Sequence, residues 1–473
     1  MALHLHRAED TGTLAAALGE VLSDPLPDPF ASELVLVSAR GMERWLSQQL
    51  SHTLGCGPAA ADEGPAPTDG VCAGIEFRSP TSLLAEIART ADGRPDDPWD
   101  PDAMVWPLLD AMDEAVATTA PWATTLATHL GYTDVGDPDE QELRRGRRYA
   151  VARRLAGLFA AYAKARPAML ADWLAGRHTD GTGRPLDADL HWQPPLWRST
   201  VGRIDADPPS ERQAKLVDQL RASAITLPTR LSLFGHTRLP AADIELLGAL
   251  ATHHDLHLWL PHPSDALWQA LSDQKGSVAR TEDTSAPAVH HPLLQTLGRD
   301  VRELQRGLPT AATDEFLAAD RTRPDTLLGW LQSDISADAV QAAPDRRHTR
   351  EDRSIQVHRC HGAARQIDVL RDVLLGLLDD DDTLQPRDIL VMCPDIDTYA
   401  PLIAAGFGLA EAGDGHPAHR LRVRLADRAP TQTNPLLAVT ARLLDLVGGR
   451  AGASEVLTLA EMGPVRSRFG FTD

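Results

Sequence analysis

The sequence predicts an α/β fold in which an all-helical segment interrupts a parallel sheet. Short apolar runs typical of buried strands alternate with helical patterns near the N-terminus, as at Leu34–Val37, and again around Leu256–Leu260. Between these runs, residues 102–176 show helical periodicity and no strand pattern. In the last long helix of this segment, one apolar face is marked by Leu143, Val151, Leu155, Leu158/Phe159 and Tyr162. Because strands that alternate with helices form parallel sheets, the helical segment is predicted to be inserted into one α/β domain.

The spacing of apolar residues also places the N-terminal elements. After the strand, Met42, Trp45 and Leu46 recur at three- and four-residue intervals, which predicts a helix beyond a short turn that contains glycine. The other predictions for this part are a strand at Leu3–His6, a helix at Thr13–Leu22, the turn Ser38–Gly41, a loop at Gly57–Gly74, a helix capped by Ser82 and a domain boundary at Pro95–Pro101.

The chain beyond the helical segment repeats the α/β pattern. The predicted elements are helices at Glu211–Ser223, Ala241–Thr252 and Leu293–Leu304, a strand at Thr229–Gly235, and a polar, disorder-prone stretch at Ser336–Asp352. A second α/β unit is predicted from a strand at Ser354–His358, a helix at Ala364–Leu378 and a strand at Asp388–Cys393.

Composition narrows the class of protein. The chain has 473 residues, 43% of them hydrophobic and 24% charged, which is typical of a globular protein with about three domains. It has no apolar run of membrane-spanning length and no signal-peptide pattern. The four cysteines form no CxxC pair, so we expect neither a zinc site nor a disulfide framework. These observations predict a cytoplasmic protein.

The turn Ser38–Gly41 stands where a nucleotide-binding protein would cradle phosphate, between a strand and a helix. A P-loop also needs a lysine directly after glycine and a Ser or Thr hydroxyl for Mg²⁺. The three lysines, Lys164, Lys215 and Lys275, do not follow a glycine. The chain is therefore expected to bind no nucleotide cofactor.

The strongest chemical pattern is a basic segment in an acidic protein. The net charge is −21, yet Leu143–Ala171 contains no Asp or Glu. That segment carries eight cations, which we interpret as a DNA-binding face because guanidinium groups match phosphate oxygens: Arg144, Arg145, Arg147, Arg148, Arg153, Arg154, Lys164 and Arg166. The alternative is a solvated helix face whose arginines pair with the acids just upstream, at 137–142.

Other polar clusters carry weaker hypotheses. Arg420, Arg422 and Arg424 alternate on a predicted strand, with Arg428 after it, and an edge strand kept soluble by charge explains them equally well. The acids at 379–382 are more simply a solvated loop, and Asp395 and Asp397 are more simply turn caps. No nucleophile motif is present.

One long stretch closely resembles a known family. Residues 357–408 read VHRCHGAARQIDVLRDVLLGLLDDDDTLQPRDILVMCPDIDTYAPLIAAGFG. Its H-x-C-H opening, PRDIxVM, DIDxYxPxI and FG resemble the RecC family, the gamma subunit of exodeoxyribonuclease V (RecBCD). LVLVSARGMERWL, the Gly157–Pro167 segment and Asn434–Leu436 resemble that family too. RecC proteins are more than twice as long, so the chain resembles their N-terminal portion.

The resemblance implies an inactive superfamily 1 helicase-like fold with RecA-like parallel-sheet domains and an inserted all-helical domain. The implied division is a first RecA-like domain at 1–95, a helical insertion at 96–224, the first domain continued with a linker at 225–345, and a truncated second RecA-like domain at 346–473. It implies a non-catalytic subunit in double-strand break repair by homologous recombination. RecB-like and RecD-like partners would use ATP and Mg²⁺ for unwinding and nuclease activity, while this subunit splits and channels DNA and scans single strands for a Chi-type sequence.

The family's Chi-scanning channel maps onto a set of positions in this sequence: Ser38, Arg40, Arg44, Ser79, Ala85, Gly157, Leu158, Ala160, Ala161, Arg166 and Arg212. Leu158, Arg166 and Arg212 match the family's residues, and Arg166 and Arg212 are expected to contact bases. The other positions depart, so we expect DNA passage with an altered or lost preferred sequence. Two alternatives are an active helicase–nuclease, which the missing lysine disfavours, and a protein-interaction scaffold without DNA contact, which the basic segment disfavours.

Overall fold

The chain folds into two compact units, Met1–Ser354 and Ile355–Asp473. The computed structural model describes all residues except 29, 55–70, 134–136, 277, 279–281, 320–321, 341–345, 408–420, 422, 426–433, 449–450 and 472–473. Most of the predicted loop Gly57–Gly74, together with Arg420, Arg422 and Arg428, lies outside the described residues.

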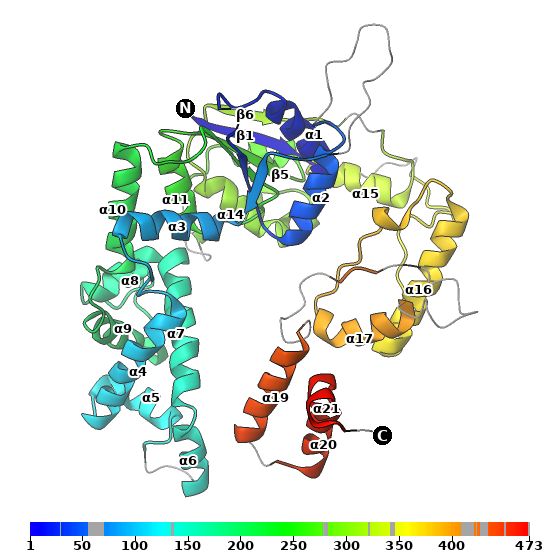
Figure 1. The fold of residues 1–473 in the computed structure, drawn as a ribbon. Coiled ribbons are helices and arrows are strands. Elements are labelled where there is room, and N and C mark those ends of the chain that lie inside the picture. The colour runs from blue at the N-terminus through cyan, green and yellow to red at the C-terminus, as the bar shows by residue number, and fades with distance from the viewer. Residues whose placement is uncertain are drawn as a thin grey trace. The chain divides into compact units, whose positions relative to one another are not determined.

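The first unit is organised around one parallel sheet of six strands in the order β3-β2-β4-β5-β1-β6 (Figure 1). The strands are β1 (Leu3–Ala8), β2 (Glu33–Val37), β3 (Ile75–Arg78), β4 (Arg230–Phe234), β5 (Asp255–Pro261) and β6 (Thr313–Phe316). The predicted β1, β2, β4 and β5 are confirmed. The edge strands β3 and β6 were not predicted, because each has only four residues and carries exposed acids such as Glu76 and Asp314.

Helices cover both faces of the sheet. On one face, strand residues such as Leu36, Leu233 and Leu258 pack against α3 (Pro80–Asp92), α10 (Pro209–Ala222) and α11 (Ala241–Leu250). On the other, Val35, Phe234 and their neighbours pack against α1 (Thr11–Leu22) and α2 (Arg40–Leu50). Burial on both faces explains why the central strands are continuous apolar runs in the sequence.

The N-termini of the helices depend on short polar side chains. The Asp10 carboxylate caps α1 by accepting hydrogen bonds from the backbone N–H groups of Gly12 and Thr13. Helix α3 is capped by Ser79, whose Oγ accepts a hydrogen bond from the Ser82 N–H at 3.1 Å. The prediction that Ser82 is the cap is therefore wrong, because Pro80 at the first helical position lets the helix begin three residues earlier.

The segment between α3 and α10 is a helical bundle with its own core, and the helical prediction is confirmed for the described residues. Its helices are α4 (Pro101–Ala117), α5 (Thr124–His129), α6 (Pro138–Arg145), α7 (Arg148–Ala165), α8 (Pro167–Leu174) and α9 (Gln193–Val201). Phe159 of α7 lies in the core, with its ring 5.3 Å from that of Trp197. Leu143 was predicted to belong to the same face, but it is 65% exposed because α6 ends before α7 begins.

The rest of the first unit packs beside the sheet. It contains α12 (Asp265–Ala270), α13 (Pro292–Leu297), α14 (Arg299–Gly307) and α15 (Leu327–Ser336). The single helix predicted at Leu293–Leu304 is wrong, because the chain breaks at Gly298. Arg7 connects β1 to β6 and α12. Its guanidinium donates hydrogen bonds to Asp314 at 2.6 Å and Asp265 at 2.7 Å and lies over the Trp268 ring.

The second unit is helical where it is described. It contains α16 (Ala363–Asp380), α17 (Ile396–Phe407), α19 (Pro435–Gly448), α20 (Ala453–Glu461) and α21 (Gly463–Phe469). The predicted helix at Ala364–Leu378 is confirmed, but the strands at Ser354–His358 and Asp388–Cys393 are wrong. Those segments have no neighbouring strand among the described residues, and a strand without a partner has no ladder of hydrogen bonds to hold it. Val357 and Leu390 are accordingly exposed.

None of the described helices is both long and apolar enough to cross a membrane. Within the same residues, no group of three or more His, Cys, Asp or Glu side chains is arranged to hold a metal ion.

Candidate nucleic-acid interface

Helix α7 has one face buried in the helical bundle and one face exposed to solvent. Ala152, Leu155, Ala156 and Phe159 are buried in the helical bundle. Beyond its first turn, the exposed residues of α7 are Arg153, Arg154, Gly157, Ala161, Lys164 and Ala165. At 1.5 Å of rise per residue, the arginines and the lysine are about 15 Å apart along the helix. The small residues between them leave an unobstructed surface, and a Cβ added to Gly157 would meet no atom within 4 Å.

Ion pairs divide the predicted basic segment into two sets. Three arginines pair with acids: Arg144 with Glu140 at 2.6 Å, Arg145 with Glu142 at 3.4 Å, and Arg148 with Asp113 at 3.2 Å. We call Arg144, Arg145 and Arg148 the paired set. For Arg144 and Arg145 these partners are acids of the same helix, as the alternative interpretation from the sequence expected, and their role in DNA binding stays a prediction.

The remaining cations of the basic segment have weaker ion pairs or none among the described residues. Arg154, Lys164 and Arg166 are exposed, and within the described part of the chain none of them forms an ion pair; we call these three the free set. Arg147 resembles them, while Arg153 lies 3.9 Å from Asp102 in a pair that is exposed on both sides. Exposed pairs at that distance stabilise little, so Arg153 can exchange its carboxylate for another anion.

Arg166 occupies the junction between α7 and α8. Helix α7 ends at Ala165, and Pro167 is the first residue of α8. The Arg166 backbone N–H donates to the Tyr162 carbonyl at 2.7 Å. Burial raises the pKa of the Tyr162 hydroxyl, and the Arg166 charge opposes that rise.

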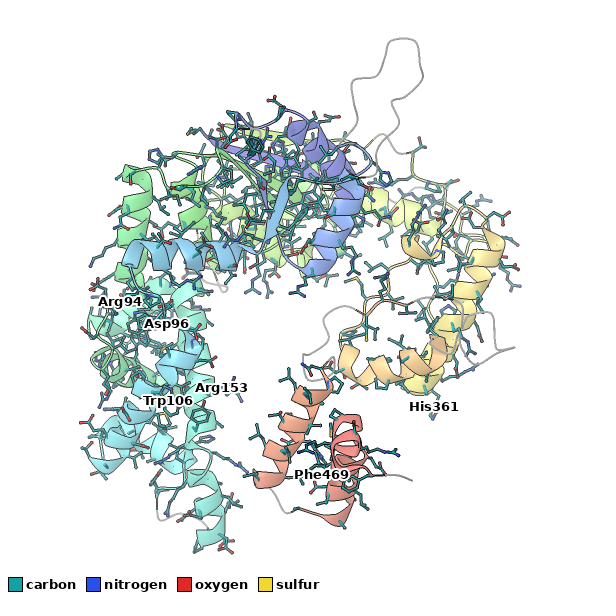
Figure 2. All side chains as sticks on the ribbon, viewed as in Figure 1. Arg94, Asp96, Trp106, Arg153, His361 and Phe469 are labelled. Atoms are coloured by element: carbon teal, nitrogen blue, oxygen red, sulfur yellow. The ribbon has the colours of Figure 1, made fainter. Side chains whose placement is uncertain are left out.

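A groove of about 990 Å³ lies where the helical bundle meets the helices of the sheet, at the level of Arg94 and Asp96 in Figure 2. Lys164 and Arg212 line it, as do Ala85, Ala160 and Ala161 from the predicted channel set. The Arg212 guanidinium donates to Asp97 at 2.6 Å and is largely buried, so it is held in place. Burial raises the pKa of Asp243 in the same groove, and Lys164 opposes that rise.

The other members of the predicted channel set lie at the sheet. Ser38 follows β2 and Ser79 follows β3, and because these strands are parallel neighbours both serines lie at the same edge. Arg40 and Arg44 are exposed on the first turns of α2. In parallel sheets, ligands commonly bind at the edge formed by the carboxyl ends of the strands. Leu158, by contrast, packs against the core of the helical bundle.

Sequence reasoning missed the acids that line the groove and the aromatic side chains beside α7. Asp97 and Asp243 are more than a hundred residues apart in the sequence, and the fold places both in this groove. The one sequence feature that could have indicated these acids is the acidic PDDPWDP segment, which contains Asp97 and which we interpreted as a domain boundary.

Comparison with known proteins settles the family. Residues 3–338, which include the whole sheet and the helical bundle, match the family model described as RecC, N-terminal domain. The chain belongs to the RecC family. Residues 433–473 match a second RecC model, the fourth domain of the RecBCD enzyme subunit RecC.

Several relatives carry the name RecBCD enzyme subunit RecC. Those of Mycolicibacterium smegmatis and Mycobacterium tuberculosis are 64% and 63% identical over the full length of this chain. That of Escherichia coli is 30% identical over 95% of it. In each case this RecC-family chain spans about two fifths of the relative, 41% or 42% of its length.

Proposed function

We propose that this chain is a non-catalytic, DNA-binding part of a RecBCD-type complex that acts in double-strand break repair by homologous recombination in the cytoplasm. RecB-like and RecD-like partners supply ATP-driven unwinding and nuclease activity. The relatives' name, RecBCD enzyme subunit RecC, supports the complex and these partners. The parallel sheet with a helical insertion supports a helicase-like fold, which in this chain lacks a P-loop lysine.

One observation carries the DNA-binding part of the proposal. The free set, Arg154, Lys164 and Arg166, lies exposed on one helix and its C-terminal junction, and its members form no ion pair among the described residues. In a protein with a net charge of −21, such a group is well suited to hold phosphate locally while the rest of the surface repels DNA.

The test compares two triple variants of the full chain that change the net charge equally. Replacing the free set with alanine removes three cations that are available to phosphate, and replacing the paired set removes three that carboxylates already neutralise. Binding of a labelled single-stranded oligonucleotide is measured by anisotropy at several salt concentrations. The free-set variant should flatten the slope of log K against log salt by about 2, at about 0.7 per phosphate contact on single strands.

The paired-set variant is the control, and its slope should change by less than half as much. Equal changes in the two variants would mean that only net charge matters, and unchanged slopes in both would remove α7 from the DNA interface.

We also propose that ATP and Mg²⁺ act only on the partner subunits. Neither Ser38–Gly41 nor the turn before α1 contains a lysine, and at α1 the Asp10 carboxylate occupies the N–H groups that phosphate would need. Saturable binding of ATP to the chain in a calorimetric titration would contradict this.

Scanning for a Chi-type sequence is proposed for Arg166 and Arg212, with Ser38, Arg40, Arg44, Ser79 and Leu158 along the path. An arginine fork discriminates a guanine by about 1–3 kcal/mol when it is well placed. In the assembled complex, Arg166→Ala should leave unwinding intact and abolish any sequence-dependent change in the cleavage pattern. A destabilised variant with an unaltered pattern would assign Arg166 a structural role.

A further inference from the structure

Two aromatic side chains lie exposed on the surface where α4 packs against α7. Trp106 of α4 is 60% exposed and Tyr149 of α7 is 44% exposed. Their ring centroids are 5.6 Å apart and the rings are tilted by 45°. All ten tryptophans of the chain are described, and the other nine are buried or half-buried. Aromatic rings normally go inside, so an exposed pair indicates a surface that binds something.

The packing of α4 does not explain the pair. The buried face of α4 consists of Met104, Val105, Leu108 and further residues toward its C-terminus, and Trp106 lies off that face. The core of the helical bundle is filled by other rings, including those of Trp197 and Phe159. Trp106 therefore contributes little to the core, and its ring is available from solvent.

Cationic side chains of α7 lie beside the Trp106–Tyr149 pair. Arg153 lies one turn beyond Tyr149 and is 65% exposed, and its loose contact with Asp102 joins α7 to α4 next to Trp106. Figure 2 labels Trp106 and Arg153 on this part of the helical bundle. The free cations Arg154 and Lys164 continue along the same helix. Rings beside a row of cations are the combination that binds single strands, whose bases stack on aromatic faces while the phosphates contact the cations.

We propose that Trp106 and Tyr149 form a stacking platform for the bases of single-stranded DNA, with Arg153 holding an adjoining phosphate. The inference rests on the proposed DNA-binding function and adds to it a contact with bases that does not depend on their sequence. Duplex DNA keeps its bases stacked on one another, so the platform distinguishes single strands from duplex. A protein partner is the competing occupant, since protein interfaces are also rich in Trp, Tyr and Arg. The row of cations that continues from Arg153 along α7 favours a single strand, because it matches a run of phosphates.

The test uses the full chain and a fluorescein-labelled oligothymidylate, with Trp106→Ala and Tyr149→Ala. Each substitution should weaken binding about 5- to 100-fold, the range observed when a stacking residue is lost. The slope of log K against log salt should stay unchanged, because no phosphate contact is removed. Trp106→Phe should recover most of the affinity, and the affinity for a blunt duplex should not move.

The outcomes separate this proposal from the one on which it rests. If the free-set variant weakens binding and the aromatic variants do not, the DNA-binding function stands and the platform is wrong. If neither affects DNA and Trp106→Ala instead prevents RecB-like or RecD-like subunits from copurifying, the pair is a protein contact. Because Trp106 is exposed, the variants should keep the circular dichroism spectrum and the thermal unfolding profile of the parent chain.

Discussion

Replacing Phe159 with alanine should destabilise the helical bundle by about 3–5 kcal/mol. The ring is fully buried and lies between Trp173 and Trp197, with centroids 6.4 Å and 5.3 Å away, so its removal leaves a cavity that these rigid rings cannot fill. The chain has several separate cores, and a single unfolding transition is not expected. Hydrogen exchange is therefore the appropriate measurement, and protection should fall on α4, α7 and α9 while the sheet is unaffected.

A matched control is available in the same chain. Phe30→Ala makes the identical substitution at a side chain that is 95% exposed, so protection everywhere should stay within the experimental error. If Phe159→Ala lost protection over the sheet as well, the helical bundle and the sheet would be one cooperative core rather than two.

Acidification should weaken the sheet more than the helical bundle. Burial lowers the pKa of His236, His257 and His262 to about 4 in each case, and all three lie on or directly after β4 and β5. Neighbouring groups add to the effect, namely His6, His4 and Arg230 at His257 and the Arg7 guanidinium at His262. The folded sheet therefore keeps these imidazoles neutral.

The direction of the pH dependence follows from these pKa values. In the unfolded chain a histidine binds its proton at about pH 6.5. Stability is fully present above that pH and is lost as the pH falls from about 6.5 toward 4, because only the unfolded chain takes up protons there. Each group costs about 1.4 kcal/mol between pH 7.5 and pH 5.5, so the three histidines together cost roughly 4 kcal/mol over that range.

Hydrogen exchange of β4 and β5 at pH 7.5, 6.5 and 5.5, corrected for the intrinsic exchange rate, measures this loss. His236→Gln should reduce the pH dependence by about a third, since it removes one of the three groups. A variant that kept the full pH dependence, or a sheet equally stable at pH 7.5 and 5.5, would contradict the assignment.

The sequence was informative where local pattern and burial agree. The central strands are apolar on both faces and α7 carries a clear apolar face, so both were predicted and confirmed. The edge strands were missed because four-residue, partly acidic segments have no periodicity to detect. The strands predicted at Ser354–His358 and Asp388–Cys393 have β-forming composition, but strand formation depends on a neighbouring strand, which local sequence does not reveal.

In the candidate site, too, only the features that local sequence determines could be predicted. The basic character of α7 is visible in the sequence, whereas the division into a paired and a free set is not, because Asp113 reaches Arg148 across 35 residues. The pairing of Arg212 with Asp97 spans 115 residues, and the contact of Trp106 with Tyr149 likewise joins two helices. Such contacts depend on how the bundle packs, and no spacing rule along the chain predicts them.

The most direct test of the central claim is photo-crosslinking in the complex assembled with RecB-like and RecD-like subunits and bound to a DNA end. Benzoylphenylalanine is placed at Ala161, an exposed residue between Arg154 and Lys164, and in a control variant at Ala16, an exposed residue on the outer helix α1. We expect the Ala161 variant to crosslink to DNA and the Ala16 variant not to. Crosslinks from Ala161 to protein alone, or equal DNA crosslinking from both positions, would show that α7 is not the DNA-binding face.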